Sequence, residues 1–171
     1  KKAVLSIFLI FVWLSCTSMK VIETKLVSIK SEVEQRIEEY LNTYYPTTPL
    51  KASWVVQYSQ EFDVSPEFIL TISQLETSHA TNPNAIRCLR NKTIFSQGEW
   101  DDGSSRISYT SYKESVRDFC KIIKTNYLVR GITEQQLIEN FVNREGYRYA
   151  SFPEYEKYMR IQYQYFRRIL Y

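Results

Sequence analysis

Helix-start signals followed by apolar residues at spacings of three and four dominate this chain, and they constrain its fold more than any other feature. The clearest signal is Ser65-Pro66-Glu67, which precedes Phe68, Ile69 and Ile72. The predicted helices run from about Pro49 to Phe62, Pro66 to Glu76, Ser111 to Tyr127, Thr133 to Phe141, and Pro153 to Ile169. With only 4 glycines and 5 prolines in 171 residues, the composition excludes collagen-like and linker-like chains and argues against a turn-rich β-sandwich.

The stretch between the second and third of these helices has a different pattern. Residues Asn82–Arg90 are loop-like. Ile94–Gly98 and Arg106–Tyr109 alternate as short strands on either side of Asp101-Asp102-Gly103-Ser104, which favours a turn. The sequence therefore predicts a mainly α domain with one small β-hairpin.

The beginning of the sequence is typical of a secretory signal. Two lysines precede the apolar run Ala3–Leu14, which is shorter than the roughly 20 residues that a membrane-spanning helix needs. Leu14-Ser15-Cys16 resembles a bacterial lipobox, in which Cys16 carries the lipid after cleavage. We therefore predict an exported protein, anchored to the membrane of the bacterial cell envelope as a lipoprotein. The alternatives are an ordinary cleaved signal and an uncleaved anchor.

A helical arm is predicted to follow this segment. Apolar residues recur at helical spacing from Val21 to Tyr40, with Glu and Lys filling the remaining positions. The predicted organisation is a signal segment over 1–16, an arm over 17–48 and the main domain over 49–171. Such an arm permits dimers without requiring them, so the oligomeric state stays open.

Charge and composition argue against several classes of function. A net charge of +3 is too small to indicate nucleic-acid binding. One histidine and three cysteines provide few ligands for a zinc site, so we expect no metal and no cofactor. Because export permits disulfides, Cys88 and Cys120 are either a disulfide pair or two buried thiols.

Glu76 is the residue that departs most clearly from the helical pattern. It follows Ile72 by four residues and Ile69 by seven, which places a carboxylate on the apolar stripe of its helix. Burial and the negative end of the helix dipole both raise the pKa of such a carboxyl. A carboxyl that stays protonated near neutral pH suits a general acid for glycosidic cleavage. The alternative is a solvent-facing glutamate at a helix end.

Four stretches, in order along the chain, resemble segments of the bacterial glucosaminidase family of peptidoglycan hydrolases. They are Ile72–Ser78, Asn91–Phe95 with Gly98, Tyr109–Asp118 and Tyr149–Tyr155. The family belongs to the lysozyme-like superfamily and is distantly similar to lytic transglycosylases. The resemblance covers roughly residues 54–158 and implies a lysozyme-like helical domain.

This sequence also departs from the family pattern. Ser96 stands where the family usually has Gly, and Phe152 stands where it has Asp. Lys92 and Thr93 interrupt the family's paired Asn. Thr77-Ser78-His79 replaces the usual Gly-Trp-Gly, so substrate contacts are expected to differ.

The resemblance makes Glu76 the general acid of the reaction. It implies that Tyr149 orients the 2-acetamido group or stabilises positive charge at the anomeric carbon, unless Tyr149 is a core residue. Glu99 is the candidate for a second catalytic carboxylate. The candidate substrate-binding residues are Phe95, Trp100, Tyr109 and His79; for His79 the alternative is a cation that caps the helix end.

The resulting hypothesis is a peptidoglycan hydrolase that cleaves glycan strands as an N-acetylglucosaminidase. Without a second carboxylate, the acetamido group of the substrate or the 6-hydroxyl of N-acetylmuramate would be the nucleophile; the latter gives a lytic transglycosylase. Two further alternatives are a non-catalytic glycan-binding or scaffold module and a phage-derived lysin on the same fold.

Overall fold

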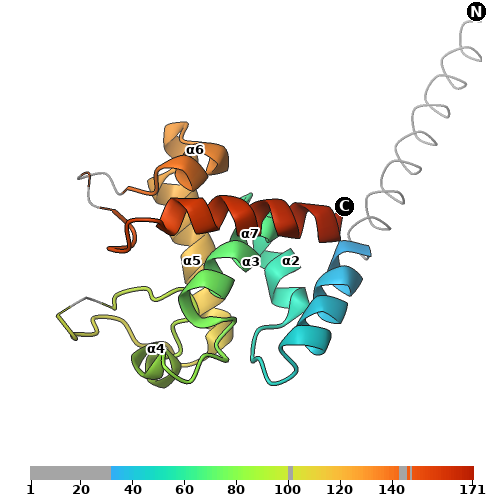
Figure 1. Ribbon diagram of the computed structural model, residues 1–171, viewed down its shortest axis with the longest axis horizontal. Coiled ribbons are helices and arrows are strands. Elements are labelled where there is room, and N and C mark those ends of the chain that lie inside the picture. Colours follow the sequence, from blue (N-terminus) through green and yellow to red (C-terminus); the bar gives the residue numbers. More distant parts are fainter. Residues whose placement is uncertain (1–31, 100–101, 143–145, 147) are drawn as a thin grey trace, which may run out of the picture.

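The computed structural model describes residues 32–99, 102–142, 146 and 148–171, and it is mainly α, as predicted (Figure 1). The arm helix covers residues 32–44. It is followed by α2 (Ala52–Phe62), α3 (Pro66–Thr77), α4 (Ile86–Asn91), α5 (Tyr112–Asn126), the 3-10 helix η1 (Leu128–Arg130), α6 (Glu134–Glu139) and α7 (Tyr155–Leu170).

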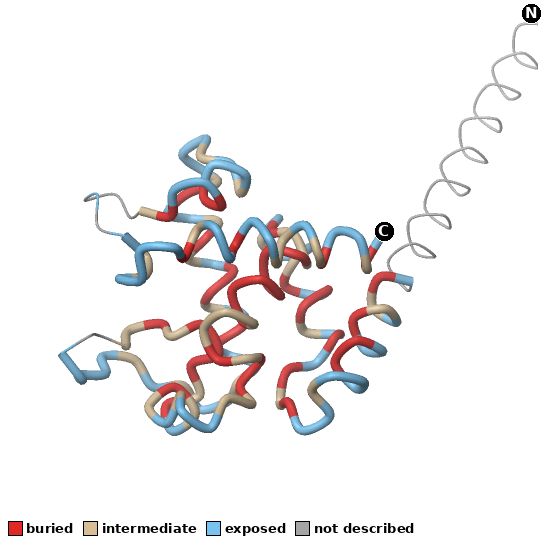
Figure 2. Tube along the Cα trace, viewed as in Figure 1, coloured by how far each residue is buried: buried red, intermediate tan, exposed pale blue. Residues whose placement is uncertain are grey.

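Helix α3 lies at the centre of this arrangement. It packs against α7 along its length and also against α2, which in turn packs against α5. Every residue from Phe68 to Ser73 is buried, so this helix is enclosed on all sides, as the continuous red tube in Figure 2 shows. A helix so enclosed can hold the polar residues of its last turn in a fixed position.

Three of the predicted helix starts are confirmed at the level of their hydrogen bonds. The Ser65 hydroxyl accepts from the Phe68 amide at 3.2 Å, and the Ser111 hydroxyl accepts from the Glu114 amide at 3.2 Å. Thr133 forms the reciprocal capping box of α6. These contacts lie within four residues of sequence, which is why the pattern alone revealed them.

Other local predictions are wrong because tertiary contacts changed them. Thr48 does not cap a helix: its hydroxyl donates to the His79 carbonyl, and α2 begins only at Ala52. The predicted loop after Asn82 contains the short helix α4. The spacing of the tyrosines in the last predicted helix places Tyr158 on its buried side, but in α7 Met159 is fully buried and Tyr158 is 41% exposed.

The predicted β-hairpin is not confirmed as a pair of strands. Among the described residues there is an isolated antiparallel bridge between Glu99 and Ser105, and the Arg106 amide donates to the Gly98 carbonyl at 2.8 Å. Gly98 has a φ of 69°, and a Cβ there would lie 2.7 Å from the Ile107 side chain. The segments around Gly98 and Arg106 therefore approach each other closely at this point without forming a regular β-ladder.

The described part of the arm belongs to the same hydrophobic core as the rest of the chain. Val33, Ile37, Tyr40 and Leu41 are all buried within the main cluster. Figure 1 shows the arm helix beside the end of α7. The predicted signal segment, including Cys16, and the start of the arm lie outside the described residues. Of the helices in the described ranges, none combines the length and apolar content that crossing a bilayer requires.

Of the two alternatives for Cys88 and Cys120, the disulfide is not formed. Both side chains are buried free thiols: Cys88 lies 3.4 Å from the Ser96 hydroxyl, and Cys120 is packed in the core on α5. The alternative, two buried thiols, is therefore correct.

We expect the melting temperature to be the same with and without a reducing agent. A disulfide contributes about 2–4 kcal/mol, which corresponds to roughly 4–16 °C in a chain of this size. Calorimetry in the presence and absence of dithiothreitol checks this. A fall of that size on reduction would mean that the two thiols pair in solution.

Candidate active site

Glu76 lies in the last turn of α3 and meets side chains from two other segments. The Tyr155 hydroxyl, from the first residue of α7, donates to Glu76 Oε1, and the interaction with the Ser96 hydroxyl also lowers the pKa of this carboxyl. The residue is half-buried. Three segments that are distant in sequence therefore converge on one carboxyl.

Burial raises the pKa of Glu76 above its ordinary value. The hydrogen bonds from Tyr155 and Ser96 act in the opposite direction, because they stabilise the ionised form, but burial is the larger effect. The raised pKa agrees with the placement that the helical spacing predicted. A carboxyl in this setting retains its proton at a higher pH than a glutamate in water does.

Phe95 and Tyr149 fix the loop that carries Ser96. The Phe95 side chain is fully buried and stacks on Phe119, with ring centroids 4.0 Å apart. The Tyr149 hydroxyl donates to the Phe95 carbonyl at 2.6 Å, and its ring stacks on Phe141 at 4.2 Å. Phe95 was predicted to contact substrate, and its complete burial contradicts this. Tyr149 acts on the loop backbone in this structure.

Glu99 has its own set of partners. Its carboxylate accepts from Asn91 Nδ2 at 2.8 Å and from Ser105 Oγ at 2.5 Å, and Arg87 lies 3.7 Å away. Its side chain is only 5% exposed. The structure thus places Glu99 at the antiparallel bridge with Ser105. The Glu99 carboxylate does not contribute to the pKa shift of Glu76.

Tyr109 lies at the edge of the same region. Its hydroxyl donates to Asp118 Oδ2 at 2.6 Å, and burial together with this carboxylate raises the Tyr109 pKa. The ring is half-buried, which leaves part of it accessible. Trp100, the other predicted aromatic contact, lies outside the described residues.

His79 is not a substrate contact, and it is not a cation at the helix end. It has no exposed surface, its Nδ1 lies 2.7 Å from Ser73 Oγ, and its Nε2 lies 3.2 Å from the Tyr40 hydroxyl. Burial lowers its pKa to about 3, so the ring is neutral at physiological pH. Its side chain faces the arm, because the backbone turns sharply after α3.

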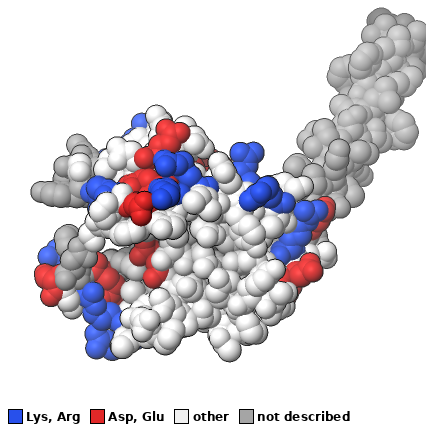
Figure 3. Space-filling model, in the orientation of Figure 1, with Lys and Arg blue, Asp and Glu red and all other residues white. Residues whose placement is uncertain are grey.

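The face of the molecule shown in Figure 3 has a recess on the side where α7 begins in Figure 1. Acidic side chains are visible inside this recess. A separate open hollow of about 570 Å³ lies at the opposite end of α3, and its lining includes Ser65, Lys124 and Glu134 but not Glu76. The shape of the surface alone therefore does not single out Glu76.

Two site residues were missed in the sequence analysis. Tyr155 was part of the segment that resembles the glucosaminidase family, and Ser96 was noted only as a departure from it. The sequence feature that could have identified Tyr155 is its position in the first turn of the predicted helix that begins at Pro153. Its contact with Glu76 depends on how α7 lies across α3, which local patterns do not determine.

The described residues contain no cluster of three His, Cys, Asp or Glu side chains that is able to hold a metal ion. Comparison of the sequence with models of known protein families and with curated proteins gave no match. The chemistry of this site therefore has to be argued from its own residues.

The raised pKa of Glu76 predicts a difference between the pH-stability curves of wild type and Glu76→Gln. The folded state holds this proton more tightly than the unfolded state, so its contribution to stability is present below the unfolded pKa and lost as pH rises through the folded pKa. Each unit by which the pKa is raised is worth about 1.4 kcal/mol. We expect the Gln variant to gain stability relative to wild type as pH rises from 4 to 8. Urea unfolding at several pH values measures this, and a constant difference would contradict it.

Proposed function

We propose that this protein is a peptidoglycan hydrolase that cleaves glycan strands, acting as an N-acetylglucosaminidase with Glu76 as the general acid. The observation that carries the proposal is the half-buried Glu76 carboxyl, whose pKa is raised by burial and whose Oε1 is held by Tyr155. A general acid needs its proton near neutral pH and a fixed direction for delivering it. The ordered resemblance of residues 54–158 to the glucosaminidase family supports this assignment.

Tyr155, Tyr149 and Ser96 assist Glu76 in different ways. The Tyr155 and Ser96 hydroxyls hold the carboxyl in one orientation, so that its proton is directed towards the oxygen of the scissile bond. Tyr149 holds the Phe95 carbonyl and thereby keeps Ser96 in place. Tyr109, which is half-buried, remains the candidate for contact with the sugar.

The surroundings of Glu99 favour a mechanism without a second carboxylate. Its carboxylate is held by Asn91, Ser105 and Arg87, and no acidic neighbour raises the pKa of Glu76 among the described residues. Protonation of the leaving oxygen by Glu76 would then accompany attack on the anomeric carbon by a group of the substrate. Attack by the 2-acetamido oxygen gives hydrolysis after water opens the intermediate, whereas attack by the 6-hydroxyl of N-acetylmuramate gives an anhydro sugar and makes the protein a lytic transglycosylase. In either case the proton of the attacking water or hydroxyl passes to Glu76, which is ionised after protonating the leaving oxygen.

Product analysis of digested peptidoglycan tests the proposal directly. Mass spectrometry of the fragments is expected to show reducing N-acetylglucosamine ends. Anhydro-N-acetylmuramate ends would assign transglycosylation, and reducing N-acetylmuramate ends would assign muramidase activity. Intact strands after prolonged incubation would reject catalysis and favour the alternative of a non-catalytic glycan-binding module.

The cellular location is part of the same proposal. Peptidoglycan lies outside the cytoplasmic membrane, so a hydrolase acting on it has to be exported, and a lipid on Cys16 would hold it at the membrane. The variant Cys16→Ser is expected to move from the membrane fraction to the soluble fraction after expression in a bacterial host. Unchanged membrane association would point to an uncleaved anchor.

A further inference from the structure

The turn directly after Glu76 has an unusual backbone. Ser78, His79 and Ala80 have φ values of 49°, 56° and 62°, so three consecutive residues occupy the left-handed region. None of them is glycine, and a Cβ disfavours this conformation. Such a segment persists only where the surrounding structure holds it in place.

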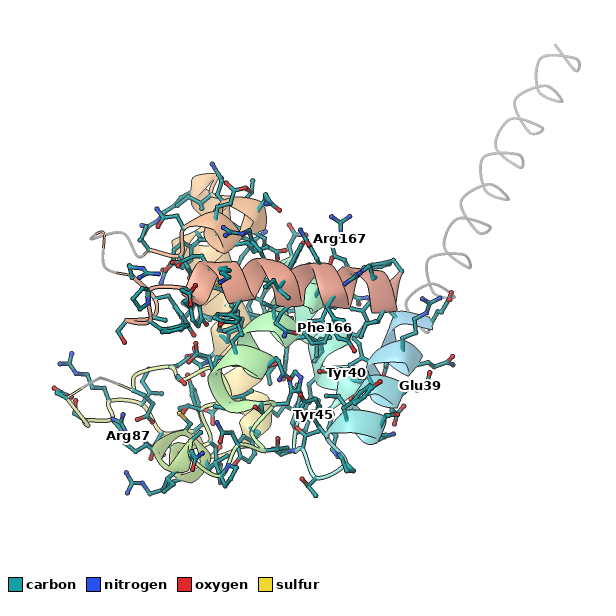
Figure 4. All side chains as sticks on the ribbon, in the orientation of Figure 1. Glu39, Tyr40, Tyr45, Arg87, Phe166 and Arg167 are labelled. Carbon is teal, nitrogen blue, oxygen red and sulfur yellow. The ribbon has the colours of Figure 1, made fainter. Side chains whose placement is uncertain are left out.

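Two residues that precede α2 in the chain hold this turn at its central residue. The Tyr40 hydroxyl, from the arm helix, lies 3.2 Å from His79 Nε2, and the Thr48 hydroxyl donates to the His79 carbonyl. The His79 ring also packs edge-on against Tyr45, at 4.8 Å, and Phe166 lies on its other side at 6.2 Å. Figure 4 shows Tyr40, Tyr45 and Phe166 gathered between the arm helix, α3 and α7.

The hydrogen-bond directions around His79 follow from the available partners. The Ser73 hydroxyl donates to the Leu70 carbonyl at 3.0 Å, so its oxygen accepts the proton of His79 Nδ1 at 2.7 Å. Nε2 of the neutral ring is then an acceptor, and the Tyr40 hydroxyl is the donor that meets it. Gln74 Oε1, at 3.3 Å, is the other acceptor for this proton. The Tyr40 hydroxyl of the arm therefore lies within hydrogen-bonding distance of Gln74, in the last turn of α3, and of His79, just beyond the end of this helix.

This turn is connected directly to the helical turn that carries Glu76. The Ser78 amide donates to the Gln74 carbonyl at 3.0 Å, and the His79 amide donates to the Ser73 carbonyl at 2.9 Å. Both hydrogen bonds span Glu76. If the turn opens, these bonds are lost, and Glu76 is left in a frayed helix end.

We propose that Tyr40 and Thr48 are positioning residues for Glu76, which hold the left-handed turn after α3 so that the carboxyl keeps the orientation in which it meets Tyr155. This inference rests on the proposed function, since it assigns to the arm a role in the reaction of Glu76. Both residues are buried, so they act through the turn and not by contact with the substrate. The arm is thus a part of the catalytic apparatus as well as a connection to the preceding segment.

Kinetics of matched variants test the proposal. Tyr40→Phe is expected to lower kcat five- to twentyfold with KM changed less than twofold, because the sugar contacts stay and only the direction of the acid is loosened. Thr48→Val is expected to have the same effect, while Thr48→Ser, which keeps the hydroxyl, retains wild-type kcat. The control is Tyr112→Phe, which removes a hydroxyl that donates to the Leu89 carbonyl at 3.2 Å, outside the turn. Equal kcat values for Tyr40→Phe and Tyr112→Phe would overturn the proposal.

Amide hydrogen exchange gives a readout that does not depend on activity. The amides of His79, Ala80 and Thr81 are expected to exchange at least tenfold faster in Tyr40→Phe, with the α5 amides unchanged. Unchanged exchange, or faster exchange with wild-type kcat, would overturn the proposal. If Glu76→Gln is fully active, the proposed function fails; if it is inactive while Tyr40→Phe matches wild type in both measurements, only the role of the arm fails.

Discussion

The Glu76→Gln variant is expected to cleave glycan strands about a hundred- to ten-thousand-fold more slowly than wild type, the range typical of general acid catalysis. Glutamine has nearly the same shape and still accepts the hydrogen bond from Tyr155, but it has no acidic proton. The rate of release of soluble fragments from purified peptidoglycan measures this loss. The effect is expected in kcat, with KM close to the wild-type value, because the proton is transferred only in the transition state.

Glu67→Gln is a closely matched control for this substitution. Glu67 lies in the first turn of the same helix, is 6% exposed, and has a pKa that burial raises. A loss of activity that arises from removing any buried carboxyl of α3 would appear in both variants. We expect Glu67→Gln to keep at least half of the wild-type rate. Equal rates for the two variants would contradict the role of Glu76.

The second large effect is expected from Phe95→Ala, which should lower the free energy of unfolding by about 3–5 kcal/mol. Phe95 has no exposed surface and stacks on Phe119, so its removal leaves a cavity in the centre of the aromatic core. At about 2–4 °C per kcal/mol, the melting temperature should fall by roughly 6–20 °C. Urea unfolding and calorimetry measure the two quantities independently.

Phe152→Ala supplies the comparison for this stability change. Phe152 is 50% exposed, and within the described ranges its recorded ring contact is the stack on Tyr158, so its removal is expected to cost less than about 1 kcal/mol. Losses of similar size in the two variants would mean that Phe95 does not lie in the core. Phe95→Ala should also reduce activity at temperatures where it is folded, because loss of the ring contact with Phe119 loosens the backbone that Tyr149 bonds and that leads into Ser96.

The sequence was informative wherever a contact spans only a few residues. Ser65, Ser111 and Thr133 each cap the helix that their neighbours predicted, because the donor and acceptor lie within one helical turn. The placement of Glu76 on the apolar side of α3 followed from the same helical spacing. Burial then raises its pKa in the direction that this placement predicts.

The sequence was misleading wherever a residue had both a local and a distant partner. Thr48 and Pro49 have the pattern of a helix start, but the Thr48 hydroxyl bonds to His79, which is 31 residues away. His79 follows Glu76 by three residues, which in a continuing helix would place both side chains on one face. The left-handed turn after α3 instead directs His79 into the core. The two cysteines Cys88 and Cys120 are enough for one disulfide, but in the folded protein they are separate buried thiols.

The sequence alone determined the helical class, three of the helix starts and the acidic residue on a buried stripe, because each of these depends on backbone hydrogen bonding and side-chain spacing within a few residues. The tertiary structure decided that Tyr155 and Ser96 meet Glu76, that Glu99 is held by other partners, and that Tyr40 lies against His79. These contacts join segments that are up to 79 residues apart. Their geometry is fixed by the way in which α7 and the arm helix pack around α3, and no local pattern specifies that packing.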